Sequence, residues 1–145
     1  MKFALGNDHI GFSLINELKP YFKTKGLKTC HLGAYNDERM NYPEIAFKVS
    51  EMVAEGSCQQ GILICGTGLG MSIAANKVQG IRAVVCSEPY SAKMARSHNN
   101  ANILCLGSRV VGIEMAKMII DIWLESKFEN GRHKKRVEMI DNYYK

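Results

Sequence analysis

The chain has 145 residues, of which 46% are hydrophobic, so residues 1–145 fit one domain with an ordinary core. No apolar run is long enough to cross a bilayer, and the first residues turn polar too early for a signal peptide, so we expect a cytoplasmic protein with no membrane partner. The formal net charge is +5, with much of the excess in residues 132–136, but no nucleic-acid-binding module or aromatic interleaving accompanies these charges, so we expect no nucleic-acid partner.

The five cysteines are odd in number and include no CxxC pair. This usage favours reduced thiols in the cytosol over a disulfide framework. Three of the five lie in apolar runs and are expected to be small core residues: Cys30, Cys86 and Cys105.

Apolar runs alternate with segments of helical periodicity along the whole chain. We expect strands over residues 2–7, 27–32, 61–65, 82–86 and 102–106. We expect helices over residues 11–25, 43–55, 69–77, 89–98, 112–126 and 131–144. Pro20 falls inside the first helix, where proline favours a break or an end. Five short strands alternating with helices predict an α/β fold, a doubly wound parallel sheet with helices on both faces.

The most informative segment is residues 61–77, in which an apolar run ends at Cys65 and a glycine-rich turn leads into a helix. In an open parallel sheet, ligands bind at the carboxyl ends of the strands, and the free N–H groups of a helix start favour an anion. A thiol there is a candidate base or nucleophile. Gly66, Gly68 and Gly70 match neither a dinucleotide fingerprint nor a P-loop, and a tight turn that simply requires glycine remains an alternative.

Further polar residues cluster at three places. Asp8 and His9 follow the first strand, where the aspartate is alternatively just a helix cap. His98 and its neighbour Asn99 end a helix, where a histidine is alternatively just a partner of the helix dipole. The third cluster consists of Arg132, His133 and Arg136, and it provides a basic helix face that suits a phosphate or is simply solvated. Arg109 is an isolated further candidate for binding a phosphate.

The histidines stand at positions 9, 31, 98 and 133, without HxxxH spacing, so we expect no metal site. A serine hydrolase is poorly supported because the GxSxG motif is absent.

Taken together, these segments resemble the ribose-5-phosphate isomerase type B family, which also includes the galactose-6-phosphate isomerase subunits. The matching segments are residues 7–11, 41–43, 61–77, 80–83, 98–102, 106–109 and 131–133, in that order. The resemblance covers nearly the whole chain. Many relatives have Asp-Tyr-Pro where this chain has Asn41-Tyr42-Pro43, a difference that bears on loop contacts or sugar preference.

The resemblance implies a Rossmann-like three-layer α/β/α sandwich with a five-stranded parallel sheet. It also implies a metal-free and cofactor-free aldose–ketose isomerase of a sugar phosphate. The expected assembly is a homodimer or a dimer of dimers with active sites shared between chains, and we expect the helix near residues 131–144 to pack on a partner chain.

The resemblance also assigns roles to individual residues. Cys65 corresponds to the base, and Met71 stands where relatives lacking this cysteine carry a glutamate. The remaining catalytic positions fall on Asp8, Thr67 and the ring-opening His98. Substrate- or phosphate-binding positions fall on His9, Tyr42, Gly66, Gly68, Gly70, Asn99, Arg109, Arg132, His133 and Arg136.

The resulting hypothesis is interconversion of ribose 5-phosphate and ribulose 5-phosphate through an enediolate. The same chemistry on a six-carbon phosphate, such as allose or galactose 6-phosphate, is the nearest alternative. A non-catalytic sugar-phosphate sensor is a more distant alternative, since a sensor needs only the arginines.

Overall fold

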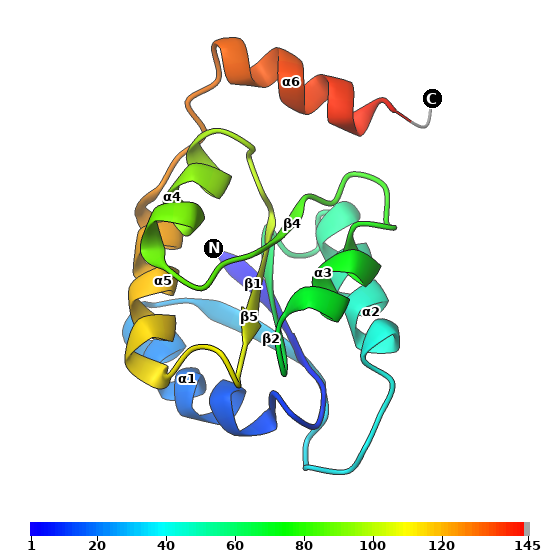
Figure 1. The fold of residues 1–145 in the computed structure, drawn as a ribbon, viewed down its shortest axis with the longest axis vertical. Helices are drawn as coiled ribbons and strands as arrows, with labels where there is room; N and C mark the ends of the chain where they lie inside the picture. Colours follow the sequence, from blue (N-terminus) through cyan, green and yellow to red (C-terminus); the bar gives the residue numbers. More distant parts are fainter. Residues whose placement is uncertain (144–145) are drawn as a thin grey trace.

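The computed structural model describes residues 1–143, which form a three-layer α/β/α sandwich around a five-stranded parallel sheet (Figure 1). The strands are β1 (Lys2–Asn7), β2 (Lys28–Gly33), β3 (Gln60–Cys65), β4 (Ala83–Val85) and β5 (Ile103–Gly107). Their order is β2-β1-β3-β5-β4 and every neighbouring pair is parallel. The chain therefore changes winding direction between β1 and β3, and ligands bind at such a switch point in this class of sheet. The predicted fold is confirmed.

Helices cover both faces of the sheet (Figure 1). One face packs against α1 (Phe12–Thr24), α4 (Pro89–Ser97) and α5 (Ile113–Glu125), and the other against α2 (Tyr42–Ala54) and α3 (Leu69–Ala75). The last helix, α6 (Arg132–Asp141), lies across one end of the sandwich, above the amino ends of the strands.

Two apolar clusters, one on each face of the sheet, form the core. All six residues of β3 are buried, as a central parallel strand requires. The largest buried side chain is Trp123 of α5, whose indole N–H donates to Gln60 Oε1 at 2.6 Å while the Arg96 guanidinium lies over its ring. This hydrogen bond satisfies the indole N–H inside an otherwise apolar layer.

The structure corrects some local predictions. Helix α1 does not break at Pro20: this residue is exposed, and buried Leu18 and Phe22 hold the turns on both sides against the core. All five cysteines are free, as predicted, but Cys30 is only partly buried because β2 is an edge strand. Helix α6 ends at Asp141 with Asn142 as its C-cap, so the predicted helix was too long by residues 142 and 143, and residue 144 of the predicted range lies outside the described residues.

Among the described residues, none of the helices combines the length and apolar character needed to cross a membrane.

Candidate active site

The loop after β1 brings Asp8 and His9 to the switch point. The Asp8 N–H donates to Ile64 O at 3.2 Å, and the buried Asp8 carboxylate accepts from Gly11 N at 2.9 Å through Oδ1. The carboxylate thus closes the turn that precedes α1, but Asp8 is not the helix cap that the alternative interpretation expected, because Gly11 holds that position without a side-chain capping bond. The neighbouring His9 accepts from Met40 N at 3.3 Å through Nδ1, which fixes the ring beside the loop that leads to α2.

Cys65 ends β3 beside this loop. Its side chain is only 5% exposed, and Sγ accepts a hydrogen bond from Gly68 N at 3.1 Å. Gly68 adopts a left-handed φ of 79° at the start of α3, a conformation that other residues adopt at a steric cost. The turn thus aims a backbone N–H at the sulfur atom of Cys65.

The loops after β3 and β5 lie side by side through backbone hydrogen bonds. Ser108 N donates to Cys65 O at 2.8 Å, and Arg109 N donates to Gly66 O at 3.0 Å. The pairing needs Gly107, because a Cβ there would lie 2.7 Å from the carbonyl carbon of Thr67. Arg109 and Thr67, both exposed, are therefore held beside Cys65 by main-chain contacts.

Tyr42 completes this edge from the first turn of α2. Its ring lies so close to Gly70 that a Cβ at Gly70 would come within 2.6 Å of Tyr42 Cζ. Nine of the predicted site residues thus gather where β1, β3 and β5 end, and we call them the rim group: Asp8, His9, Tyr42, Cys65, Gly66, Thr67, Gly68, Gly70 and Arg109.

The remaining predicted residues form a second group at the opposite edge of the sheet. Helix α4 starts after β4 and returns to the amino end of β5, so its last turn places His98 and Asn99 far from Cys65. The five residues of β5 alone separate the two edges by about 13 Å. We call this set the α6 group: His98, Asn99, Arg132, His133 and Arg136.

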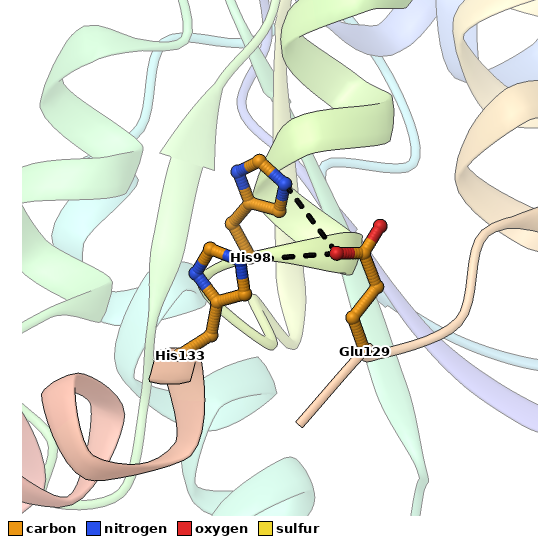
Figure 2. Close-up of side chains that lie close together, drawn as sticks. All are labelled: His98, Glu129 and His133. Atoms are coloured by element: carbon orange, nitrogen blue, oxygen red, sulfur yellow. Dashed lines mark ion pairs between the residues drawn. The ribbon is translucent and has the colours of Figure 1, made fainter. Parts of the chain in front are cut away.

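Within the α6 group, the rings of His98 and His133 stack with centroids 4.1 Å apart and planes 10° apart. The Nε2 atoms of His98 and His133 lie 3.7 Å and 3.8 Å from Glu129 Oε2 (Figure 2). Burial lowers the pKa of His133, and nearby His98 and Arg132 lower it further. Arg132 and Arg136 are exposed one helical turn apart, so both point from the same side of α6.

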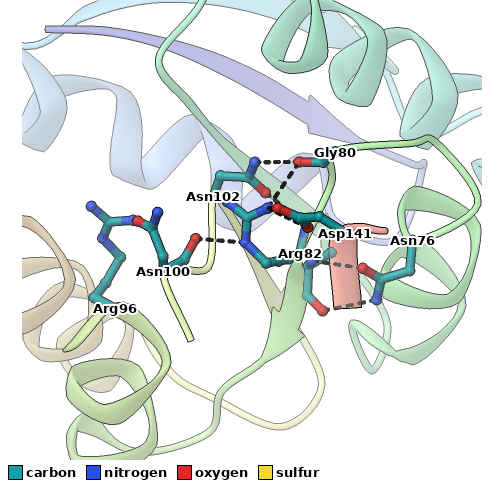
Figure 3. Close-up of polar contacts among 8 residues, drawn as sticks. Asn76, Gly80, Arg82, Arg96, Asn100, Asn102 and Asp141 are labelled. Carbon is teal, nitrogen blue, oxygen red and sulfur yellow. Dashed lines mark hydrogen bonds and ion pairs between the residues drawn. The ribbon is translucent and has the colours of Figure 1, made fainter. Parts of the chain in front are cut away.

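A polar network anchors α6 to the body (Figure 3). The Arg82 Nη1 group donates to both carboxylate oxygens of Asp141, at 2.8 Å and 2.9 Å, while Arg82 Nε donates to Asn100 O at 3.0 Å. Asn102 accepts from Arg82 N at 2.8 Å and donates to Gly80 O at 2.9 Å. The far end of α6 is therefore tied to the segment before β4.

Two other thiols near the sheet are poor nucleophiles. Burial raises the pKa of Cys86 to about 12 and raises that of Cys105 well above its ordinary value. Both thiols are therefore protonated at neutral pH, whereas a thiol that acts as a base must be deprotonated.

Two residues that contact predicted site residues were not themselves expected from the sequence. Buried Asn7 donates through Nδ2 to Asp8 O at 2.9 Å and to Ala34 O at 3.0 Å, so it holds the loops after β1 and β2 together. A polar residue ending an apolar strand was the available signal. Glu129, whose carboxylate lies to one side of the two stacked histidine rings, carried no sequence signal because its partners are set by tertiary packing.

The fold and the rim group define a doubly wound α/β protein with a candidate ligand site at its winding switch, built from an aspartate, a cysteine and a glycine-rich helix start. The chain belongs to the Ribose/Galactose Isomerase family, whose model matches residues 3–140.

Individual relatives agree with this assignment. The chain is 54% identical over 139 residues to ribose-5-phosphate isomerase B of Escherichia coli (strain K12), covering 96% of this chain and 93% of that protein. The structure of Clostridium thermocellum ribose-5-phosphate isomerase B matches with a TM-score of 0.97 at 49% identity, covering 99% of this chain and 97% of that one. Ribose-5-phosphate isomerase B from Mycoplasma genitalium, solved with bound ribulose-5-phosphate, matches with a TM-score of 0.93 at 40% identity, covering 98% and 95% of the two chains.

Proposed function

We propose that this protein interconverts ribose 5-phosphate and ribulose 5-phosphate, with Cys65 as the base. The observation that carries the proposal is the position of Cys65 Sγ: it ends β3 at the winding switch and accepts a hydrogen bond from Gly68 N at 3.1 Å. Family membership and the ribulose-5-phosphate bound to the Mycoplasma genitalium relative support the substrate class.

The reaction begins with opening of the sugar ring, because aldose phosphates rest largely as closed rings. His98 suits this step, since a histidine both donates and accepts protons near neutral pH. The phosphate is held by guanidinium and imidazole groups, and this remote binding positions the reacting carbons. The groups assigned to the phosphate are His9, Arg109, Arg132, His133 and Arg136.

The Cys65 thiolate then removes the proton from C2 of the open aldose, and the electron pair forms the C1–C2 double bond of an enediolate. The Thr67 hydroxyl and backbone N–H groups of the turn stabilise the developing oxygen charge, at about 3 kcal/mol for each well-placed donor. The N–H groups of Gly68 and Leu69 are not counted among these donors, because they donate to Cys65 Sγ and Thr67 Oγ1. Asp8 moves or orients the proton between O1 and O2, and Cys65 returns its proton to C1 to give the ketose. Tyr42 and Asn99 complete the lining around the sugar.

The separation of the rim group from the α6 group supports an assembly in which each site uses two chains. His98 and Cys65 lie at opposite sheet edges of one chain, so a second chain must bring its α6 group to the rim. A cavity of about 1020 Å³ runs between α6 and the segment that leads into β4. Met139 and Ile140 line it and are 66% and 55% exposed, which favours a second copy as the occupant of this region. A homodimer, or a dimer of dimers, in the cytoplasm is the assembly we propose.

Isotope exchange tests the base directly. Cys65→Ala is expected to lose solvent-deuterium incorporation at C2 and to lower kcat by at least about 100-fold, since general-base catalysis contributes about 10²–10⁴-fold. Binding of ribose 5-phosphate, measured by calorimetry, is expected to persist. Cys30→Ala is the matched control, because Cys30 lies on edge strand β2 away from the rim group. Normal turnover in Cys65→Ala would rule out the assigned base.

A six-carbon phosphate is the second candidate substrate, and one residue beside the rim group bears on sugar preference. Asn41 precedes the rim residue Tyr42, caps α2 and directs Nδ2 to Glu44 Oε1 at 3.4 Å, where many relatives carry an aspartate. Comparison of kcat/KM for ribose 5-phosphate, allose 6-phosphate and galactose 6-phosphate decides between the five-carbon and six-carbon substrates. A preference for a six-carbon phosphate would replace the substrate while keeping the mechanism, whereas absence of deuterium exchange with every sugar phosphate would point to a sensor.

A further inference from the structure

The cluster formed by His98, Glu129 and His133 lies at the junction of three segments (Figure 2). His98 ends α4, Glu129 lies in the segment between α5 and α6, and His133 is in the first turn of α6. Their side-chain ligand atoms, one nitrogen or oxygen from each residue, all lie within 4.8 Å of one another. Two imidazoles and a carboxylate are therefore gathered around one point.

The backbone holds these three side chains in place. Glu129 N donates to Ser97 O at 3.0 Å, which ties the residue carrying the carboxylate to the last turn of α4, directly before His98. His133 N donates to Asn130 O at 3.0 Å. Asn130 and Gly131 both have positive φ values, 61° and 54°, and form the sharp turn that returns His133 toward His98. Main-chain hydrogen bonds and the turn at residues 130–131 therefore position the three residues of the cluster.

The contacts of Glu129 with the two histidines are within ion-pair distance, and they are charged pairs only when the rings are protonated. The two Nε2–Oε2 distances, 3.7 Å and 3.8 Å, are longer than hydrogen bonds, although the carboxylate oxygen faces both rings. A tetrahedral zinc ion bound at about 2.0–2.1 Å separates its ligand atoms by about 3.4 Å. Because imidazole nitrogens bind a metal in the plane of the ring, the two stacked rings would open toward Glu129 so that both nitrogens and the oxygen converge on one ion.

The donor set also matches a metal of definite chemistry. Two histidines and one glutamate, with a position left for water, form one of the common ligand sets of Zn²⁺ in proteins. Imidazole ligands favour zinc and its first-row neighbours over Mg²⁺ or Ca²⁺, which prefer oxygen ligands alone. Arg132 and Arg136 add positive charge nearby, but both are exposed, so water and salt screen their effect on a bound cation.

We infer that His98, Glu129 and His133 form an inhibitory binding site for Zn²⁺ or a closely related divalent transition metal ion. Binding of the ion occupies His98 Nε2 and pulls His133 toward Glu129. The inhibition rests on the proposed function, in which His98 opens the sugar ring, whereas binding of the ion does not depend on it. No sequence motif marks this site, because its ligands are 31 and 4 residues apart, outside the usual zinc motifs.

Equilibrium dialysis of the full chain with Zn²⁺ tests the binding. The key variant is Glu129→Gln, and Glu125→Gln is its matched control, an exposed glutamate with the same change of charge at the end of α5. All three proteins keep five cysteines, so zinc bound by thiols contributes equally. Wild type and Glu125→Gln are expected to bind one more ion than Glu129→Gln, or to bind it at least about tenfold more tightly. Equal binding by all three overturns the site.

Activity then tests the inhibition. Zn²⁺ is expected to inhibit wild type and Glu125→Gln, EDTA to reverse the inhibition, and Glu129→Gln to keep its basal activity and resist the ion. Equal inhibition of Glu129→Gln would place the inhibitory ion elsewhere and overturn the inhibitory role. Glutamate-dependent binding without inhibition would leave the metal site standing and count against His98 as the ring-opening residue, so the two proposals fail separately.

Discussion

Asn7 supports the candidate site although it takes no part in the chemistry. Its amide donates to the carbonyl groups of Asp8 and Ala34, and its Oδ1 accepts from His31 Nε2 at 2.5 Å. One fully buried side chain thus joins the loops after β1 and β2. Removing a partner from such a buried network leaves groups unsatisfied, which costs about 1–3 kcal/mol for each.

The His31 contact makes stability depend on pH. Burial, together with the nearby charge of Lys19, lowers the pKa of His31 to about 4 in the folded chain. The unfolded chain keeps an ordinary histidine pKa near about 6.5. Between these values the unfolded state binds more protons, so His31 lowers stability as the pH falls from about 6.5 toward 4.

We expect His31→Gln, whose amide can still donate to Asn7, to lose less stability than wild type between pH 7.5 and pH 5. The difference is about 1 kcal/mol once the partial exposure of the ring is taken into account. Urea unfolding at the two pH values measures it, and parallel losses in both proteins would contradict the assignment.

Several site residues were predictable because each carries a local signal. Cys65 ends an apolar run before a glycine-rich turn, and Asp8 follows the first strand directly, so both were expected at the carboxyl edge of the sheet, and the structure places them there. Glu129 was not predictable, because its neighbours are set by the way α4 and α6 pack. Long-range pairing of this kind leaves no periodicity or spacing in the sequence.

At the scale of elements, α6 stands apart from the other helices. Its side chains are mostly exposed, with His133 and Val137 buried, and its anchors are the histidine stack at one end and the Arg82–Asp141 pair at the other. The element boundaries followed from the sequence to within a few residues, but the path of α6 across the end of the sandwich did not. An amphipathic pattern indicates which face a helix buries and not where the helix goes.

Asp141→Asn tests whether the anchor positions the basic face of α6. The change removes the charge that pairs with Arg82, which is expected to lower stability by about 1 kcal/mol. If Arg132 and Arg136 hold the phosphate, KM for the sugar phosphate should rise about fivefold with a smaller change in kcat. Steady-state kinetics measure both.

Glu138→Gln is the control for this experiment, since Glu138 lies on the same helix and its partner Lys134 is exposed at 4.0 Å. An exposed pair of this kind contributes little. Equal effects of the two variants on KM would show that the Arg82 anchor has no special part in binding.

At the scale of the whole molecule, the two groups of site residues face away from each other. No bending of one sandwich brings His98 to Cys65 without disrupting β5, which is buried throughout. The two-fold assembly that we propose would pair the rim group of each chain with the α6 group of the other, so that both sites would be equivalent.

Complementation tests this arrangement. Cys65→Ala and His98→Asn are each expected to be inactive, and after joint unfolding and reassembly the mixture should recover about a quarter of wild-type activity. Random pairing makes half of the dimers mixed, and one of the two sites in each mixed dimer has both residues. Each variant taken alone through the same treatment is the control. No recovery, with mixed dimers verified by mass, would mean that a single chain supplies the whole site.

The single tryptophan of the chain, Trp123, lies fully buried behind the sheet, with its indole bound to Gln60 at the amino end of β3. Intrinsic tryptophan fluorescence therefore reports on the edge of the sheet opposite to Cys65. Emission should shift to the red when the sandwich melts and stay constant when a ligand settles at the rim. One optical signal thus separates a variant that has lost its fold from a variant that has lost only its chemistry.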